Sequence, residues 1–236
     1  MSAWDTRLKK KAVTFSYDDG VTQDIRLIEL LNKYGLKATF NLNSDMLGRP
    51  GVLIRDNQRV AQYRIHAKDV KSVYEGHEVA AHTLTHPKLI GREEAEIVRQ
   101  VEQDRIQLSE LVGYDVVGMA YPGGGINNDD RVAGIIREKT GIRYARTTTC
   151  TERFALPSRL YRLDPTAFHL MEHEALMSLG EAFVNSRADV PQIFYVWGHS
   201  YELDIGSDGW ARLEEFFKLI ANRDDIFYGT NAEILL

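Results

Sequence analysis

Alternation of hydrophobic and polar residues predicts strands that take turns with helices along the chain. In the first strand-like segment, residues 12–17, the larger apolar side chains Val13, Phe15 and Tyr17 occupy every second position, as in a strand with one buried face. The next segment, 22–35, has apolar residues three or four positions apart and ends at a glycine. That pattern is typical of an amphipathic helix with a glycine stop.

The same two patterns continue to the C-terminal part of the chain. Further strands are expected at 36–43, 77–82, 116–122, 143–147 and 192–199, and further helices at 67–75, 92–113, 129–140, 172–187 and 210–221. About six or seven strand–helix units without a repeat or linker indicate one domain over residues 1–236, with a largely parallel α/β sheet. We favour a closed or nearly closed barrel over an open sheet.

Composition restricts the class of protein. The chain of 236 residues is 44% hydrophobic and 27% charged, as in an ordinary soluble globular protein. A formal net charge of -5 and the lack of a basic run argue against a general nucleic-acid binder. Cys150 is the single cysteine, so no intrachain disulfide forms, which is compatible with a reducing compartment.

The N-terminal sequence has basic residues but no apolar stretch like that of a secretion signal. No apolar run approaches the ~18 residues needed to cross a bilayer. We therefore expect a cytoplasmic protein that does not enter the membrane, or a secreted one if a signal peptide has been removed. The sequence does not indicate an oligomeric state.

Polar residues with chemical potential follow several predicted strands directly. Asp18 and Asp19 end the first strand, His82 follows a short buried strand, "YP" at 121–122 follows another, and His199 ends the last. In α/β proteins the carboxyl ends of parallel strands form the active site. The sequence therefore predicts a site built from these positions.

His82 and His86 are four residues apart in "HTLTH". A single helical turn ending before Pro87 would present both imidazoles on one face, a spacing suited to a divalent metal. Spacing alone is weak, because a second pair, His169 and His173, has it too. We interpret that second pair as the surface face of a helix start.

The adjacent carboxylates of Asp18 and Asp19 repel one another and stand before Gly20, where the chain can turn sharply. One carboxylate and two imidazoles make a three-ligand metal site with open positions for water and substrate. The other carboxylate would then remove a proton from metal-bound water. A divalent cation would compensate both negative charges.

Two further features fit hydrolysis. The glycine run 123–125 follows a predicted strand, and its N–H groups could form an oxyanion hole, although a glycine-rich turn into the next helix explains it equally well. No phosphate-loop pattern surrounds it. His199, at a strand end, could donate a proton to a leaving amine or alcohol.

Taken in order, these stretches resemble the polysaccharide deacetylases of carbohydrate esterase family 4, from about Ala12 to the final helix. "TFSYDDG" is similar to the motif T-F-D-D-G, "HTLTH" to H-[ST]-x-x-H, "AYPGG" to R-x-P-x-G, and "WGH" to a hydrophobic-x-H motif. The resemblance implies a distorted (β/α) barrel with about seven parallel strands.

The resemblance also implies a role for each of six residues: metal ligands Asp19, His82 and His86, general base Asp18, general acid His199, and an oxyanion donor at the N–H of Gly123. The expected metal is zinc, with cobalt or nickel as alternatives, because this ligand set discriminates weakly among them.

Two positions depart from the family pattern. Ala120 stands where the third motif has an arginine that orients the catalytic aspartate, so another cation has to substitute for it. The family has one more motif, numbered fourth, which is an aspartate followed by tryptophan. It has no clear counterpart in this chain. Asp164 in "YRLDP" and Glu202 in "GHSYE" are the candidates.

We interpret the chain as a metal-dependent hydrolase that removes N-acetyl groups from amino sugars of a polysaccharide or oligosaccharide, acting on carbon–nitrogen bonds other than peptide bonds. Three alternatives stay open. The same site could hydrolyse another small amide, such as a cyclic ureide or formamide, or the chain could bind carbohydrate without turnover. Two histidines and a carboxylate also describe non-haem iron oxygenases, although there the carboxylate commonly lies two residues after the first histidine.

Overall fold

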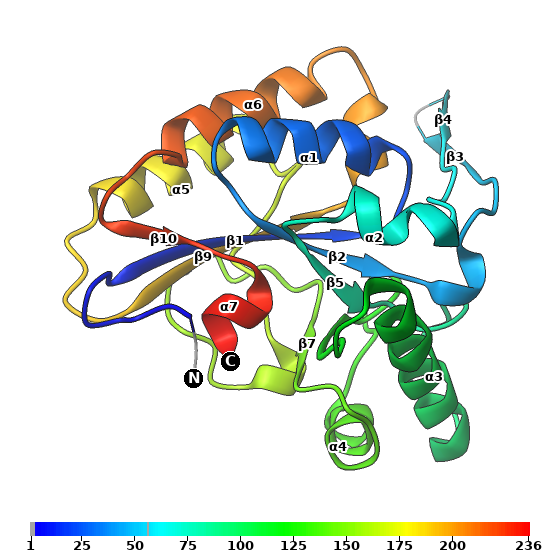
Figure 1. The fold of residues 1–236 in the computed structure, drawn as a ribbon. Coiled ribbons are helices and arrows are strands. Elements are labelled where there is room, and N and C mark those ends of the chain that lie inside the picture. Colours follow the sequence, from blue (N-terminus) through cyan, green and yellow to red (C-terminus); the bar gives the residue numbers. More distant parts are fainter. Residues whose placement is uncertain (1–2, 56) are drawn as a thin grey trace.

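The computed structural model describes residues 3–55 and 57–236. Within these residues, eight parallel strands form one sheet in the order β7-β6-β5-β2-β1-β9-β8, with β10 added beside β1. The sheet curls into a half-barrel with helices packed on its outer face (Figure 1). The predicted distorted (β/α) barrel of about seven parallel strands is confirmed.

The strands of the sheet are β1 (Lys11–Asp18), β2 (Ala38–Leu42), β5 (Glu78–Ala81), β6 (Gly118–Ala120), β7 (Tyr144–Arg146), β8 (Ala167–Phe168), β9 (Gln192–Gly198) and β10 (Ile226–Tyr228). A separate antiparallel hairpin consists of β3 (Val52–Arg55) and β4 (Gln58–Ala61). The α-helices are α1 (Gln23–Lys33), α2 (Val70–Val73), α3 (Glu94–Val112), α4 (Asp130–Lys139), α5 (His173–Asn185), α6 (Gly209–Ile220) and α7 (Asn231–Leu235). Short 3-10 helices are η1 (Ser44–Met46), η2 (Ala67–Asp69), η3 (Leu160–Arg162) and η4 (Ser200–Asp204).

Each segment predicted as a strand contains a strand, and five of the six predicted helices are α-helices over most of their length. The helix predicted at 67–75 is a 3-10 turn, η2, followed by the single-turn α2. The patterns missed the hairpin, β8, β10 and α7. These elements have two to five residues each, too few for a period of 2 or 3.6 to emerge.

Local chemistry sets several helix ends. The Asp129 carboxylate accepts a hydrogen bond from the N–H of Val132 at 2.8 Å and caps α4, as expected for an N-terminal aspartate. Gly113 ends α3 with a φ of 83°, a left-handed conformation that glycine adopts readily. Thr230 and Glu233 form a reciprocal capping box at the start of α7.

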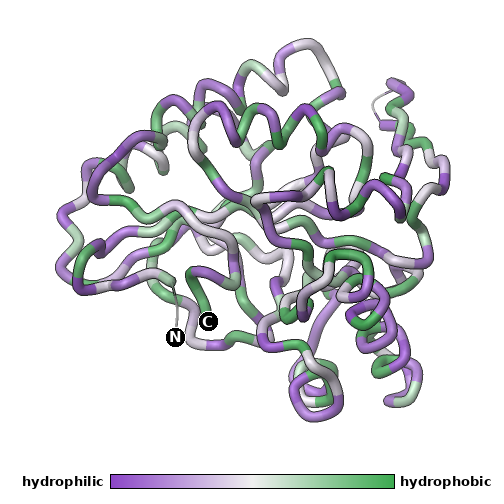
Figure 2. The backbone as a smooth tube through the Cα atoms, in the orientation of Figure 1, coloured by the Kyte–Doolittle hydropathy of each residue, from purple (hydrophilic) through white to green (hydrophobic). Residues whose placement is uncertain are grey.

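The two faces of the sheet differ in chemistry. Helices α1, α5 and α6 cover one face (Figure 1), and hydropathy alternates along them as an amphipathic helix requires (Figure 2). There, Phe15 of β1 packs edge-on against Phe217 of α6, with ring centroids 4.9 Å apart. The face inside the half-barrel carries hydrogen-bonded polar groups: buried Glu78 accepts from the hydroxyls of Thr39 and Tyr144 at 2.7 and 2.9 Å.

The predicted site residues lie at one end of the sheet. Because neighbouring strands are parallel, their carboxyl ends lie together at this end, and the site residues come directly after them in the chain. The hairpin β3–β4 also stands at this end (Figure 1). None of the helices in the described ranges has both the length and the apolar composition of a membrane span.

Candidate active site

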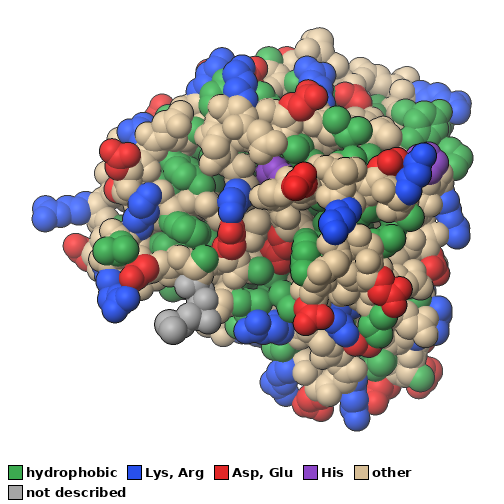
Figure 3. Space-filling model, viewed as in Figure 1, with side chains coloured by type: hydrophobic (Ala, Val, Ile, Leu, Met, Phe, Trp, Pro, Cys, Tyr) green, Lys and Arg blue, Asp and Glu red, His purple; other side chains and the backbone are tan. Residues whose placement is uncertain are grey.

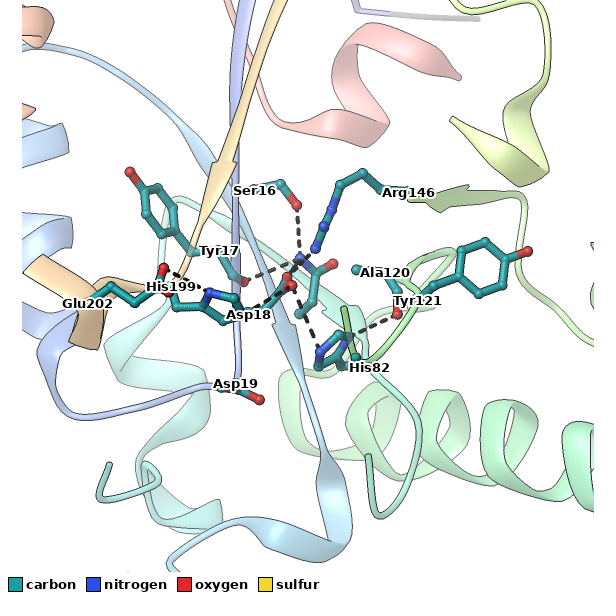
Figure 4. Close-up of polar contacts among 12 residues, drawn as sticks. Ser16, Tyr17, Asp18, Asp19, His82, Ala120, Tyr121, Arg146, His199 and Glu202 are labelled. Carbon is teal, nitrogen blue, oxygen red and sulfur yellow. Dashed lines mark hydrogen bonds and ion pairs between the residues drawn. The ribbon is translucent and has the colours of Figure 1, made fainter. Parts of the chain in front are cut away.

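Asp18 and Asp19 stand at the end of β1 with their carboxylates directed differently (Figure 4). Asp19 has a φ of 84° and Gly20 a φ of 61°, so two successive left-handed residues turn the chain. A Cβ at Gly20 would lie 2.9 Å from Cγ of Leu42, which excludes any other residue without movement. A non-glycine residue in this conformation costs about 1–3 kcal/mol, and such strain is concentrated at functional sites.

His82 follows β5 and is buried. Its Nδ1 lies 2.9 Å from the carbonyl oxygen of Ala120, so Nδ1 carries the proton and donates it. Burial lowers the pKa of His82 to about 4, which keeps the ring neutral near pH 7. Nε2 then has a free lone pair, and it is a buried atom without a hydrogen-bond partner in the described chain. An imidazole oriented by a backbone carbonyl through its other nitrogen is the usual state of a metal ligand.

His86 approaches His82 by a route that the sequence did not indicate. Their ring centroids lie 4.8 Å apart, but no helix connects them. Thr83 and His86 have φ values of 68° and 61°, and Asn43 Nδ2 donates to the carbonyl oxygen of Thr83 at 2.7 Å. The predicted helical turn is therefore wrong, because two left-handed residues bring the imidazoles together instead.

Asp19, His82 and His86 each offer one ligand atom, and these atoms lie within 4.8 Å of one another. Two imidazole nitrogens with a carboxylate oxygen fit a divalent transition metal that keeps open positions. Arg64 also contacts Asp19, with Nη2 3.3 Å from Oδ1. Burial opposes ionisation of Asp19, but Arg64 and the nearby histidines outweigh it and lower its pKa. Asp19 is thus an anion, as a ligand has to be.

Asp18 lies between two imidazoles and beside two buried donors. Its Oδ2 is 3.9 Å from Nε2 of both His82 and His199, and its Oδ1 accepts from Asn41 Nδ2 at 2.8 Å and from the Arg146 guanidinium (Figure 4). Burial opposes ionisation, but Arg146 and the two histidines outweigh it and lower the pKa of Asp18. The carboxylate is therefore charged and able to accept a proton.

His199 follows β9, and its Nδ1 lies 3.0 Å from Oε2 of Glu202 (Figure 4). Burial would lower the pKa of His199, but Glu202 and Asp18 raise it overall. The ring is therefore more readily protonated than an ordinary histidine, with Nε2 on the side of Asp18. A carboxylate that can accept a proton and an imidazole whose pKa is raised thus lie 3.9 Å apart, an arrangement suited to general acid–base chemistry.

Gly123 lies in the loop after β6, at the same end of the sheet. Its φ is 79°, and the Lys88 side chain fills the space where a Cβ would point, with Cε 3.0 Å away. Asn127 Nδ2 donates to the carbonyl oxygen of Gly123 at 2.6 Å and stabilises the loop. The role of the Gly123 N–H as an oxyanion donor stays a prediction.

The sequence profile of the family described as polysaccharide deacetylase matches residues 5–145. The chain belongs to the polysaccharide deacetylase family. The match covers the carboxylate pair, both histidines of the candidate metal site and the glycine loop. It ends before His199 and Glu202.

A curated relative of this family member is distant in sequence. The peptidoglycan-N-acetylglucosamine deacetylase PgdA of Listeria monocytogenes is 23% identical over 145 residues, 60% of this chain and 26% of that protein. The chain therefore matches about a quarter of the length of that curated relative.

Solved structures show the same fold. A family 4 carbohydrate esterase from Streptomyces lividans superposes with a TM-score of 0.58 at 13% identity, covering 95% of both chains. A family 4 pseudoenzyme from Bacillus anthracis superposes with a TM-score of 0.58 at 18% identity, covering 97% of this chain and 66% of that one. An esterase and a pseudoenzyme fit equally well, so the fold alone does not distinguish turnover from its loss.

Arg146 supplies a cation beside Asp18, although this chain has Ala120 where the third family motif has an arginine. The strand register pairs Ala120 of β6 with Arg146 of β7, and paired residues on neighbouring strands share a face. Arg146 is 0% exposed, and its guanidinium also lies over the Trp197 ring, 4.7 Å from the centroid. Sequence analysis missed Arg146 because the register between β6 and β7 is not visible in one sequence.

Of the two candidates for the fourth motif, Glu202 contacts the predicted general acid. Asp164 instead accepts a hydrogen bond from the hydroxyl of Thr147. Burial would raise the pKa of Glu202, but hydrogen bonds from His169 and His199 outweigh it and lower that pKa well below its usual range. Glu202 is therefore an anion near neutral pH, beside His199.

The interpretation of His169 and His173 as one surface pair is wrong for the first of them. His173 begins α5 and contacts Glu215 on the surface. His169 follows β8 and is buried, with Nε2 3.3 Å from Oε2 of Glu202. Burial lowers its pKa, so a neutral His169 donates to the same Glu202 oxygen that His199 contacts. The strand β8 has two residues, too few to predict this burial from periodicity.

Proposed function

We propose that this chain is a metal-dependent deacetylase that removes N-acetyl groups from amino sugars of a polysaccharide or oligosaccharide. One observation carries the proposal: Asp18 Oδ2 lies 3.9 Å from both His82 and His199, beside a cluster of three metal-type ligands. Membership in the polysaccharide deacetylase family supports the substrate class. The buried Arg146 beside Asp18 supports turnover over binding alone, because it supplies the cation that Ala120 cannot.

A divalent cation bound by Asp19, His82 and His86 would polarise the acetyl carbonyl and acidify the attacking water. Asp18 takes the proton from that water, and Arg146 keeps the carboxylate anionic until it does. The Gly123 N–H donates to the developing oxyanion. His199 then gives its Nε2 proton to the departing amine nitrogen.

Glu202 holds His199 for that step. Its Oε2 accepts from Nδ1 of His199 at 3.0 Å, which directs Nε2 into the site and favours the protonated ring. Zinc is the proposed metal, with cobalt and nickel as alternatives, since two imidazoles and a carboxylate bind all three.

The direct test is release of acetate from N-acetylated chitooligosaccharides by zinc-supplemented protein, with chelator-treated protein as the blank. Acetate release that requires added metal is expected. Tight sugar binding without acetate release across a panel of acetylated amino sugars would instead indicate a binding module. Hydrolysis of formamides or cyclic ureides, without acetate release from acetylated sugars, would assign the same site to another amide substrate.

His82→Ala should abolish stoichiometric metal binding, because it removes a ligand whose buried Nε2 has no hydrogen-bond partner in the described chain. Elemental analysis after dialysis against zinc should give near-stoichiometric metal for wild type and a small fraction of that for the variant. His173→Ala is the matched control, since His173 contacts Glu215 on the surface, and it should retain wild-type metal. Full metal content in His82→Ala would contradict the assigned site.

Glu202→Gln should lower the pH at which activity is lost on the basic side of the pH profile. The carboxylate raises the pKa of His199, so its removal lowers that pKa and His199 loses its proton at lower pH. We expect the basic limb of kcat/KM to move down by about one pH unit, a tenfold change in the proton-binding constant. A pH profile of acetate release checks this, and an unchanged basic limb would exclude His199 as the acid that Glu202 tunes.

A further inference from the structure

The hairpin β3–β4 stands beside the carboxyl ends of the sheet strands (Figure 1), and none of the family motifs covers it. Basic and apolar side chains occur together on the surface over it (Figure 3). Its register places Leu53 opposite Val60 and Arg55 opposite Gln58. Directly paired residues of an antiparallel ladder share a face, and residues two apart on one strand share it too. These four residues therefore form one face of the hairpin.

That face is attached to the segment after His199. Val60 is buried in a cluster with Tyr201, and Leu53 packs against the same cluster. Gln58 Oε1 accepts a hydrogen bond from the N–H of Gly206 at 2.8 Å. The hairpin is thus fixed against η4 and the residues that follow it, and η4 carries Glu202.

Arg55 reaches Glu202 from this face. Its Nη1 donates to Oε1 of Glu202 at 2.9 Å, whereas His199 and His169 both contact Oε2, at 3.0 and 3.3 Å. The guanidinium therefore does not compete with either histidine for an oxygen. The Arg55 side chain is 51% exposed and that of Glu202 only 7%, so Arg55 introduces a cation from the rim onto a nearly buried anion.

We propose that Arg55 is a positioning residue for the general acid, which holds Glu202 in place and withdraws charge from its carboxylate so that His199 releases its proton more readily. The inference rests on the proposed function only in giving His199 the role of acid. A cation on one carboxylate oxygen weakens the other oxygen as a hydrogen-bond acceptor and lowers the proton affinity of its imidazole partner.

The other titratable groups that face His199 or Glu202 are Tyr17, Asp18 and Asp19 of β1 and the residue after it, His169 after β8, and Tyr201 in η4. Burial raises the pKa of both tyrosines and lowers that of His169, so all three are neutral near pH 7. The lowered pKa values of Asp18 and Asp19 keep both as anions when only Arg55 or Arg59 is replaced. A change in the His199 pKa when Arg55 is replaced therefore measures the effect of the Arg55 side chain.

The test compares Arg55→Ala and Arg55→Gln with Arg59→Ala. Arg59 pairs with Ile54 on the other face of the same hairpin and is exposed, so it matches the loss of charge without the contact to Glu202. Arg55→Gln keeps a hydrogen-bond donor for Glu202 and preserves the hairpin if Arg55→Ala loosens it. The His199 pKa is measured by NMR on zinc-supplemented protein with labelled histidine, assigned by comparison with His199→Gln.

Both Arg55 variants should raise the His199 pKa by about half a unit, a threefold change in the proton-binding constant, and Arg59→Ala should not. The difference should shrink at about 0.5 M salt, because a half-exposed charge is screened. The basic limb of kcat/KM should move up equally, with a lower plateau.

A shift in both Arg55 variants no larger than in Arg59→Ala, or a downward shift, would overturn the inference, since a merely structural hairpin contact would lower the plateau without moving the limb. The NMR titration does not need turnover. A wild-type protein that releases no acetate would therefore refute the proposed function while leaving the Arg55 measurement readable.

Discussion

Asp18→Asn should lower kcat by about 10²–10⁴-fold, the usual contribution of a general base, while the protein keeps its metal. Asparagine has nearly the same shape and still offers an oxygen to Arg146 and Asn41, the partners of Oδ1. It cannot accept the proton of the attacking water. Elemental analysis should show unchanged metal content, because Asp19, His82 and His86 are intact.

Asp164→Asn is the matched control for this result. Asp164 contacts Thr147 rather than the candidate acid or base, so the same chemical change there should leave most of the activity. Near-normal turnover in Asp18→Asn would show that the base is wrongly assigned. Loss of metal from Asp18→Asn would show instead that Asp18 is a ligand.

Arg146→Met should cost about 3–5 kcal/mol of unfolding free energy near neutral pH, because it leaves a buried carboxylate without its cation. Arg146 and Asp18 are 0% and 2% exposed in their side chains, so solvent does not replace the lost partner. In wild type the lowered pKa of Asp18 stabilises the fold above the unfolded pKa, and this stabilisation is lost as pH falls through the folded pKa.

In Arg146→Met the burial of Asp18 is unopposed by that cation, so the stability difference from wild type should shrink on acidification. Urea denaturation between about pH 4 and pH 8 measures it. The acid limb of kcat/KM should also move up, because Asp18 holds its proton to higher pH. Equal stability at all these pH values would contradict the assigned ion pair.

The strand register suggests a second substitution that should compensate for the loss of Arg146. Ala120 and Arg146 are paired on neighbouring parallel strands, so their side chains start from the same face, about 4.8 Å apart. Ala120→Arg introduced together with Arg146→Ala returns the arginine to the position of the family motif. The double variant should exceed Arg146→Ala alone in both stability and turnover, which would show that the cation matters more than the strand that carries it.

The ordering of the site along the chain could be predicted because each motif directly follows a strand whose hydrophobic pattern is visible. Asp18, His82 and His199 needed only the rule that parallel strands bring their carboxyl ends together. The sheet confirms that arrangement. The metal-binding and catalytic roles themselves stay predictions.

What could not be predicted depends on register and backbone conformation. Arg146 lies beside Asp18 because of the pairing between two strands of three residues each. Strands this short give no periodic hydrophobic pattern in the sequence. The choice of Glu202 over Asp164 depends on how η4 folds back after His199. His86 approaches His82 through residues with left-handed backbone conformations. The spacing of four residues predicts a helical turn instead.

Two of the three ligand-type residues, Asp19 and His86, adopt left-handed backbone conformations, and this limits how the centre could be transplanted. A designer who copies only the three side chains onto a regular strand and helix would aim them in other directions. The transferable unit is therefore the pair of kinked segments, 18–20 and 82–86, together with the carbonyl of Ala120 that fixes the first imidazole.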